Sequence, residues 1–318
     1  MFLNSTGYYI PEGRIGNDYF AAISGKTQDW FFQRTGMETR SRARDRETPN
    51  FMALKAVKNA LPQLPYDIGE VDLIIFASYT PFDTVGTTGH TIQRHYGIEK
   101  AKVFFLSSAC SSGVNAVEII RAFFKTGIST KALLVCADKN SAFSDDNDEQ
   151  AGHLWGDAAV ALFFSAEQHK QDDIEILDVD TEGMGHTSLG PFAVSLLTTQ
   201  KKLQMPYGRD VFVNACINMA KSTNEILAAN GYTVSDLAMF IAHQANARIL
   251  RHVVEDLGID VERSPSNLRE LGNTGCGSAF LVLAQNIDRI KAGDLVCLST
   301  FGGGYSSGSC LMRRPAAG

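Results

Sequence analysis

Cys110 is the residue whose position in this sequence best fits a chemical role. The apolar run 102–109, KVFFLSSA, leads directly to it, and a helical pattern begins just after it. A helix N-terminus offers free N–H groups and partial positive charge, which favour the nucleophilic thiolate over the thiol. Small neighbours, among them Ala109 and Ser111, leave room for a substrate. The segment indicates a nucleophile, although a small buried residue where a strand meets a helix would show the same pattern.

His243 and Asn273 are candidate partners for such a nucleophile. His243 ends the apolar run 236–243, and Asn273 lies in LGNTGCGSAF, a glycine-rich turn before another helical pattern. A buried asparagine can donate its side-chain N–H to developing negative charge. The glycines of FGGGYSSG (301–308) let backbone N–H groups approach a substrate closely. The alternatives at this point are a structural histidine and an ordinary turn between strands.

These residues lie at the ends of regular elements. Short apolar runs bounded by polar residues predict strands, and helical patterns lie between them. The strands are expected at 71–79, 102–109, 131–138, 158–165, 236–243 and 293–300, and helices at 113–125, 211–229 and 246–257. This alternation predicts crossover connections and a largely parallel core. Two strand patterns recur in the same order at an offset of roughly 160 residues, which indicates an internal duplication with a polar seam at 167–175.

Composition narrows the function classes. The 318 residues are 44% hydrophobic and 20% charged, as in soluble globular proteins. A net charge of −6 argues against nucleic acid as a partner. Six scattered cysteines and the absence of an HExxH or paired-ligand motif predict neither a disulfide framework nor a metal site. We see no signal peptide and no apolar run that spans a bilayer, so we expect a cytoplasmic protein without a membrane partner.

Six segments together resemble β-ketoacyl-acyl-carrier-protein synthase III and its relatives in the thiolase superfamily. They occur in the family's order and cover nearly the whole chain: DWFFQRTGMETR (29–40), ACSSG (109–113), WGDAAVALF (155–163), HQANAR (243–248), GNTGCGSA (272–279) and FGGGYSSGS (301–309). The resemblance implies an α/β fold of the thiolase type, with five αβαβα layers built from two duplicated halves. Residues 1–168 would carry the nucleophilic cysteine, and residues 169–318 the histidine and asparagine. A homodimer is also implied.

The resemblance implies a reaction in two stages. Cys110 takes an acyl group from an acyl-coenzyme A, and the enolate formed by decarboxylation of malonyl-acyl-carrier protein then attacks the acyl-cysteine. His243 and Asn273 would donate hydrogen bonds to the thioester oxygen during decarboxylation, and such a donor contributes on the order of 3 kcal/mol. The backbone N–H groups of Cys110 and Gly303 would form the oxyanion hole. No cofactor is implied beyond the coenzyme A and phosphopantetheine thioesters themselves.

The resemblance also assigns substrate-binding residues. Trp30 and Arg34 would flank the coenzyme A entrance, while Asn246 and Arg248 would meet pantetheine or the carrier protein. Trp155 would line the acyl pocket, and Val85 would enter it from the partner subunit.

Four positions depart from the chain-initiating members of the family. Glu149 replaces an arginine near the coenzyme A adenine, Glu255 and Asp256 replace lysines that dock the carrier protein, and the small Val85 replaces an aromatic residue. An alternative function is therefore a specialised ketosynthase that joins acyl chains in dialkylresorcinol-type or polyketide biosynthesis.

Three rival classes share parts of this pattern. A papain-like protease also orders its residues Cys, His, Asn, but its cysteine lies near the N-terminus. A silent subunit of a heteromeric synthase would usually lack one of the three residues, and all three are present here. A thioester hydrolase with the same cysteine would release free acid without using malonyl-acyl-carrier protein.

Overall fold

The chain folds around one mixed β-sheet. The computed structural model describes residues 1–197 and 199–316. Within them, nine strands pair in the order β11-β12-β13-β8-β1-β7-β6-β4-β5. Their bounds are β1 (Phe2–Tyr9), β4 (Leu73–Ala77), β5 (Lys102–Leu106), β6 (Lys131–Lys139), β7 (Asp157–Ser165), β8 (Ile174–Gly183), β11 (Leu237–Ala242), β12 (Leu295–Gly302) and β13 (Ser306–Arg313). The expected strands all form, with ends that shift by a few residues.

The two halves of the sheet repeat one topology. Outward from the β1–β8 junction, the first half runs β1, β7, β6, β4 and the second runs β8, β13, β12, β11. In each half the first two pairings are antiparallel and the third is parallel. This repetition confirms the duplicated architecture. The polar seam at 167–175 begins after β7 and reaches the first residues of β8, but the division into domains at residue 168 stays a prediction.

The expectation of a largely parallel core was wrong. Only the β4–β5, β4–β6 and β11–β12 pairs are parallel among the nine strands described. The reason lies in the connections, because a parallel pair needs a long crossover whereas adjacent antiparallel strands can be joined by a short turn. A three-residue turn joins β12 to β13, and no α-helix separates β6 from β7.

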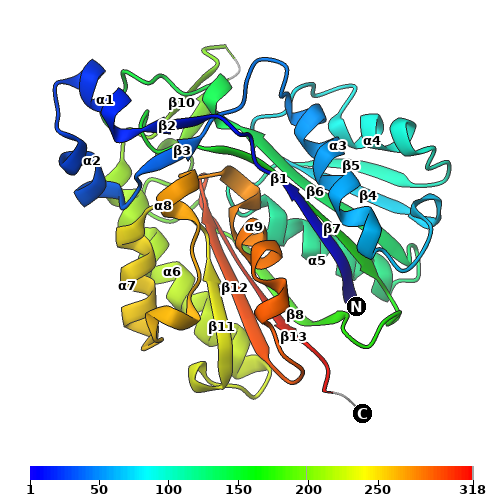
Figure 1. The fold of residues 1–318 in the computed structure, drawn as a ribbon. Helices are drawn as coiled ribbons and strands as arrows, with labels where there is room; N and C mark the ends of the chain where they lie inside the picture. Colours follow the sequence, from blue (N-terminus) through cyan, green and yellow to red (C-terminus); the bar gives the residue numbers. More distant parts are fainter. Residues whose placement is uncertain (198, 317–318) are drawn as a thin grey trace.

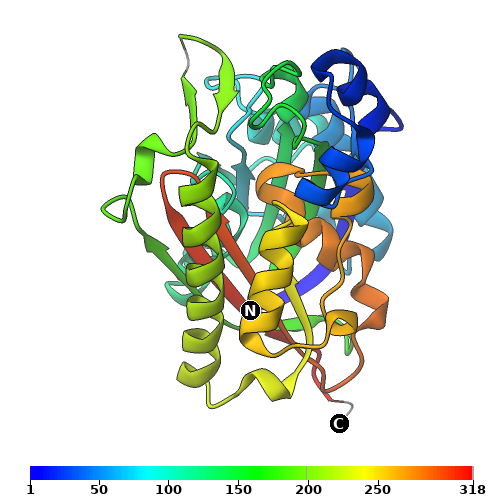
Figure 2. The ribbon, with the colours of Figure 1, turned by 90° about the vertical axis from the view of Figure 1, so that its left-hand side faces the viewer.

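Six α-helices cover and separate the two halves of the sheet (Figure 1). Helices α5 (Ser112–Lys125) and α9 (Ser278–Gln285) lie in the middle and pack with residues of both halves in one core cluster. Outside the first half lie α3 (Pro49–Ala60) and α4 (Thr88–Tyr96). Outside the second half lie α6 (Gly208–Ala229) and α7 (Ala247–Leu257), which run side by side in Figure 2. The order of layers is αβαβα, as expected.

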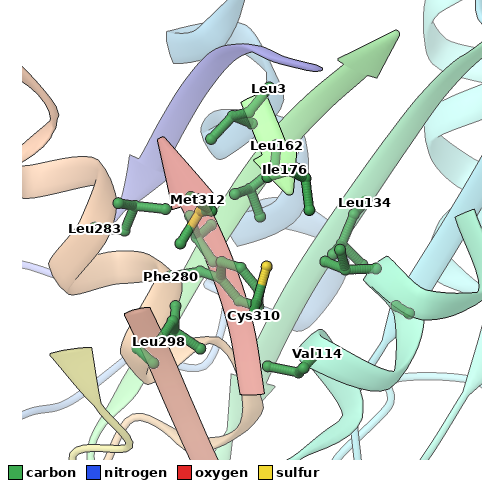
Figure 3. Close-up of a cluster of buried hydrophobic side chains, with 14 of the residues drawn as sticks. Leu3, Val114, Leu134, Leu162, Ile176, Phe280, Leu283, Leu298, Cys310 and Met312 are labelled. Atoms are coloured by element: carbon green, nitrogen blue, oxygen red, sulfur yellow. The ribbon is translucent and has the colours of Figure 1, made fainter. Parts of the chain in front are cut away.

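The central core joins both halves around α5 and α9. Figure 3 shows side chains from both helices and from strands of each half meeting there; those labelled are Leu3, Val114, Leu134, Leu162, Ile176, Phe280, Leu283, Leu298, Cys310 and Met312. The two helices approach closely at Gly113, where an added Cβ would lie 2.7 Å from the Phe280 ring. Burial of this apolar surface holds the start of α5, and therefore Cys110, against the second half.

Shorter elements surround one end of the sheet. Helices α1 (Asn17–Ser24) and α2 (Gln28–Thr35) lie beside the two-stranded ribbon of β2 (Arg14–Gly16) and β3 (Thr39–Ser41) (Figure 1). A second ribbon consists of β9 (Ser195–Leu197) and β10 (Lys202–Gln204), and the short α8 (Leu268–Leu271) precedes the Asn273 turn.

Candidate active site

Cys110 lies in the tight turn between β5 and α5. The preceding residue, Ala109, has a positive φ of 50°, an uncommon conformation for a residue with a Cβ. The Ser112 hydroxyl stabilises the turn by donating to the Ala109 carbonyl at 2.5 Å and accepting from Ser108 N–H at 2.7 Å. Gly302 approaches from the opposite half, and a Cβ there would lie 2.8 Å from the backbone nitrogen of Cys110. Glycine is therefore needed at 302 for the two halves to meet at the nucleophile.

Burial makes the resting Cys110 a thiol rather than a thiolate. Desolvation, aided by the nearby Asp138 carboxylate, raises the pKa of Cys110 to about 12. The backbone N–H groups of Gly303 and of Cys110 itself lower this pKa, which is the predicted direction, but burial outweighs them. The expected preference for thiolate was wrong for the resting site, and the proton must leave as the sulfur attacks. Because both N–H groups are close enough to the sulfur to lower its pKa, they also lie near the place where a thioester oxygen would develop charge.

His243 follows β11 and is held as a neutral imidazole. Its side chain is buried, and desolvation lowers its pKa to about 4. Nδ1 lies 2.6 Å from the Ser278 hydroxyl, whose oxygen also accepts the Gln244 N–H at 3.1 Å. If Nδ1 carried the proton, the buried hydroxyl hydrogen would have no acceptor within the described part of the chain. We therefore assign the proton to Nε2, which makes that atom a hydrogen-bond donor.

Asn273 is fixed through its backbone and its side-chain oxygen. Its N–H donates to the Leu154 carbonyl and its own carbonyl accepts from Gly156, each at 2.9 Å. The side-chain Oδ1 accepts the Gly275 N–H at 3.0 Å. Because Oδ1 is occupied, Nδ2 is the group left to donate at this buried position. Asn273 and His243 thus each present one neutral donor.

Asp138, at the end of β6, holds this arrangement together. The carboxylate accepts the hydroxyls of Ser78 and Thr80 at 2.8 Å each, and the Cys276 N–H at 2.8 Å. It therefore joins the end of β4 to the turn that carries Asn273. The sequence gives no sign of the roles of Asp138 and Ser278, because these roles come from contacts between segments far apart in the chain.

One apolar cavity of about 290 Å³ brings the three predicted catalytic residues together. Cys110, His243 and Asn273 all line it, although the first two lie 133 positions apart in the sequence and come from opposite halves. The predicted site residues Trp155, Asn246 and Gly303 line it as well. A nucleophile and two neutral donors in an enclosed apolar space are suited to acyl transfer and to stabilising an enolate oxygen.

A second cavity of about 530 Å³ adjoins the first and opens among arginines. Both are lined by Leu154, Met205, Gly208, Phe212 and Asn246, and we call the two adjoining cavities together the channel. Arg34, Arg209 and Arg248 line the outer part. Three cations at the entrance and an apolar interior suit a substrate with an anionic head and an acyl thioester at its far end.

Known proteins match this chain along almost all of its length. The family models for 3-oxoacyl-[acyl-carrier-protein (ACP)] synthase III and for its C-terminal part match residues 104–185 and 227–314. The β-ketoacyl-[acyl-carrier-protein] synthase III of Rhodospirillum centenum is 33% identical over 316 residues, which cover 96% of this chain and 97% of that protein. The chain belongs to the 3-oxoacyl-[acyl-carrier-protein] synthase III family. The resemblance drawn from the motifs is confirmed.

Solved structures of the family share this fold. 3-Oxoacyl-[acyl-carrier-protein] synthase III from Aquifex aeolicus VF5 superposes with a TM-score of 0.91 at 29% identity, covering 98% of this chain and 99% of that one. The priming β-ketosynthase from the R1128 polyketide biosynthetic pathway gives a TM-score of 0.88 at 25% identity, covering 99% and 96%. The predicted thiolase fold is therefore confirmed for this member of the family.

Two residues predicted for coenzyme A lie at the channel entrance. The Arg34 guanidinium lies 4.6 Å from the centre of the Trp30 ring, so the pair already forms a stack on the surface. Arg34 lines the outer cavity, whereas Trp30 lines neither cavity and touches the buried ring of His153, which does. Desolvation lowers the pKa of His153 to about 4, so it adds no positive charge there near neutral pH.

Asn246 and Arg248 line the channel, and both already make contacts within the chain. The Asn246 Oδ1 caps α7 by accepting the Arg248 N–H at 2.8 Å, and Nδ2 donates to the Arg34 carbonyl at 3.1 Å. The Arg248 guanidinium lies 5.6 Å from the centre of the Phe212 ring. Arg209 completes the cationic entrance. It was not predicted, because it lies in none of the six segments that resemble the family.

The remaining predicted residues lie on the surface. Val85 is 86% exposed and lines neither cavity of its own chain. Its predicted role is in the partner's pocket, so that role stays a prediction. Glu149, Glu255 and Asp256 are exposed. Within residues 1–197 and 199–316 we find no group of side chains that would hold a metal ion, and no helix there is long and apolar enough to cross a membrane.

Proposed function

We propose that this chain catalyses the β-ketoacyl-acyl-carrier-protein synthase III reaction. It would condense an acyl-coenzyme A with malonyl-acyl-carrier protein to give 3-oxoacyl-acyl-carrier protein, coenzyme A and carbon dioxide. The observation that carries the proposal is the cavity that holds Cys110 beside the two neutral donors and adjoins a second cavity lined by arginines. The two thioester substrates supply both reacting carbons, and the proposal invokes no further cofactor.

Acylation is the first step. The Cys110 sulfur attacks the thioester carbonyl, and the oxygen accepts hydrogen bonds from the N–H groups of Cys110 and Gly303. The tetrahedral intermediate then expels the coenzyme A sulfur, which leaves as the free thiol with the proton lost by Cys110. A preorganised pair of N–H groups suits this step because the donors need no reorientation as charge develops.

Decarboxylation and condensation form the second step. His243 Nε2–H and Asn273 Nδ2–H donate to the malonyl thioester oxygen while the bond to the carboxylate breaks and carbon dioxide departs. The enolate carbon attacks the acyl-cysteine carbonyl, and Cys110 leaves as a sulfur anion that is reprotonated. A buried, neutral imidazole suits this role because it remains a donor across the physiological pH range.

A housekeeping role in starting fatty-acid synthesis fits the family best. A specialised condensing role is the second candidate. The similarity to the R1128 priming β-ketosynthase favours it, as does Glu149, which places a negative charge where chain-initiating members would have an arginine near the coenzyme A adenine. The two candidates share the same three catalytic residues and differ in the acyl donor.

We also propose a homodimer that assembles through β5. This strand ends the sheet, and its outer edge is unpaired within the described residues. Phe104 on this strand is 44% exposed, and Phe82 and Val85, in the segment between β4 and α4, are exposed too. An open strand edge with apolar side chains is suited to pairing with a second copy. Six cysteines that form no disulfide agree with a cytoplasmic location.

Intact-protein mass spectrometry tests the proposal. Wild-type enzyme mixed with short and long acyl-coenzyme A thioesters should gain the mass of an acyl group, and Cys110→Ala should gain none. Addition of malonyl-acyl-carrier protein should then remove the acyl mass from the enzyme and give the 3-oxoacyl product. Release of free acid without malonyl-acyl-carrier protein would support the hydrolase instead, and no labelling by any donor would support a silent subunit.

A further inference from the structure

Two buried hydrogen-bond donors in the inner cavity are unused. The Tyr79 hydroxyl and the Trp155 indole N–H are both inaccessible to solvent, and neither has a partner within the described residues. Both residues line the cavity that contains Cys110. Buried polar groups in proteins are nearly always hydrogen-bonded, so two unpaired donors on residues that line one cavity indicate an acceptor that arrives with the ligand.

Tyr79 is held firmly beside the nucleophile. It follows β4, and its backbone N–H donates to the Asp138 carboxylate at 3.1 Å. The hydroxyl is close enough to the Cys110 sulfur to lower the pKa of that thiol, and burial beside Cys110 and Asp138 raises the pKa of Tyr79 itself. The hydroxyl is therefore a neutral donor within reach of atoms attached to the sulfur. The amide of Asn140 is its other polar neighbour.

Trp155 lines the same cavity and lies beside Asn273. Its backbone pairs with Asn273 in an isolated bridge, which places the residue near the catalytic asparagine. Trp155 is only 4% exposed. Much of the remaining lining is aliphatic or aromatic, including Leu154, Val194 and Leu196. A simple alkyl chain would fill this space and leave both donors unpaired.

We propose that the acyl group carried by Cys110 bears a neutral oxygen on its second or third carbon, which accepts hydrogen bonds from the Tyr79 hydroxyl and the Trp155 N–H. This inference rests on the proposed function and adds its substrate class, a hydroxyacyl or oxoacyl thioester. The position of this oxygen on the acyl chain follows from the position of Tyr79 beside the Cys110 sulfur. An oxygen on the second or third carbon lies within three bonds of the thioester carbon, and therefore close to that sulfur. The oxygen is neutral because no arginine or lysine lines the inner cavity of the described chain.

The test compares matched acyl donors on wild-type enzyme. Lactoyl-coenzyme A is paired with propionyl-coenzyme A, and each enantiomer of 3-hydroxybutyryl-coenzyme A and acetoacetyl-coenzyme A with butyryl-coenzyme A. The initial rate of Cys110 acylation is followed by intact-protein mass spectrometry. At least one oxygenated donor should react about ten- to a hundredfold faster than its alkyl partner, because an unpaired buried donor is strongly unfavourable.

Two conservative variants identify the groups responsible. Tyr79→Phe and Trp155→Phe should each reduce the oxygenated-to-alkyl rate ratio by about tenfold, and Tyr8→Phe, a partly exposed tyrosine outside both cavities, should leave it unchanged. Because the readout is a ratio within one protein sample, partial unfolding of a variant does not alter it.

The outcomes separate this inference from the proposed function. Alkyl donors that acylate Cys110 as fast as every oxygenated partner would overturn the substrate class and leave the condensing activity intact. A wild-type preference that survives in Tyr79→Phe and Trp155→Phe would overturn the assigned donors. Absence of acylation by every donor would overturn both.

Discussion

Replacing Ser278 with alanine should slow decarboxylation while leaving acylation almost unchanged. The Ser278 hydroxyl lies 2.6 Å from His243 Nδ1, and in the assigned tautomer it keeps the imidazole proton on Nε2. In Ser278→Ala both Nδ1 and the Gln244 N–H lose this buried partner. A buried group left unpaired costs about 1–3 kcal/mol, which corresponds to about a 5- to 150-fold change in rate. Complete loss of the Nε2 donor would set an upper limit of about 1,000-fold.

The assay separates the two half-reactions. Enzyme is first acylated by an acyl-coenzyme A, and the rate is read from intact mass. Malonyl-acyl-carrier protein is then added, and carbon dioxide release is measured in a single turnover. Acylation should stay within about threefold of wild type, because in the proposed mechanism it depends on the N–H groups of Cys110 and Gly303 and not on His243. Carbon dioxide release should fall about ten- to a hundredfold.

Two further variants control for packing. Ser278→Thr keeps a hydroxyl and should recover most of the lost rate. Ser129→Ala removes another buried hydroxyl, one without a partner, and should behave as wild type. Wild-type carbon dioxide release in Ser278→Ala, or an equal loss in both half-reactions, would refute the tautomer assignment.

Three other predictions follow from the structure. First, the pKa values of His153 and His243, each lowered to about 4, lie below the unfolded value of about 6.5. The stability that comes from keeping these histidines neutral should therefore be complete above about pH 6.5. Below that pH, the free energy of unfolding should fall toward pH 4 by up to about 1.4 kcal/mol per pH unit for each histidine. Urea titrations at several pH values measure it. Second, Gly302→Ala should lower the free energy of unfolding by about 1–3 kcal/mol and slow Cys110 acylation at least about tenfold, because the new Cβ lies 2.8 Å from the Cys110 nitrogen. Third, Arg209→Ala should raise KM for acyl-coenzyme A about three- to tenfold with kcat unchanged, and salt should reduce the difference.

Each of these has a control and a contradictory outcome. His153→Asn should flatten the dependence of stability on pH, and an unchanged slope would contradict burial as the cause. Gly183→Ala, where an added Cβ meets nothing within 4 Å, should leave acylation at the wild-type rate. Lys100→Ala is the control for Arg209→Ala, because it removes an exposed cation outside both cavities. If KM rose as much in Lys100→Ala as in Arg209→Ala, the overall charge of the protein, rather than the arginines at the entrance, would determine binding.

The sequence was most informative where a residue with a reactive or hydrogen-bonding side chain lies at the end of a strand or in a turn before a helix. Cys110 and His243 were identified because apolar strands lead directly to them, and Asn273 because a glycine-rich turn surrounds it. The repeated strand patterns predicted the duplication for the same reason, since buried strands have a recognisable composition. Periodicity does not encode strand direction, and the parallel core was therefore overestimated.

Residues that act through tertiary contacts could not be found in this way. Ser278 contacts His243 from 35 positions away, and Asp138 reaches the Asn273 turn from 138 positions before Cys276. The protonation state of Cys110 was also misjudged, because the helix N-terminus can be read from the sequence but the desolvation that outweighs it depends on the packed fold. Tyr79 carries no motif, and its unpaired hydroxyl appears only once the cavity has formed.

The division of labour between Cys110 and the pair His243 and Asn273 is the central claim, and one measurement tests it directly. Wild type, Cys110→Ala, His243→Ala and Asn273→Ala are each incubated with acyl-coenzyme A and then with malonyl-acyl-carrier protein, with intact mass recorded at both stages. We predict that Cys110→Ala never gains the acyl mass, and that the other two variants gain it but lose most of the wild-type decarboxylation. Full condensing activity in Cys110→Ala, or wild-type decarboxylation in both other variants, would contradict this account.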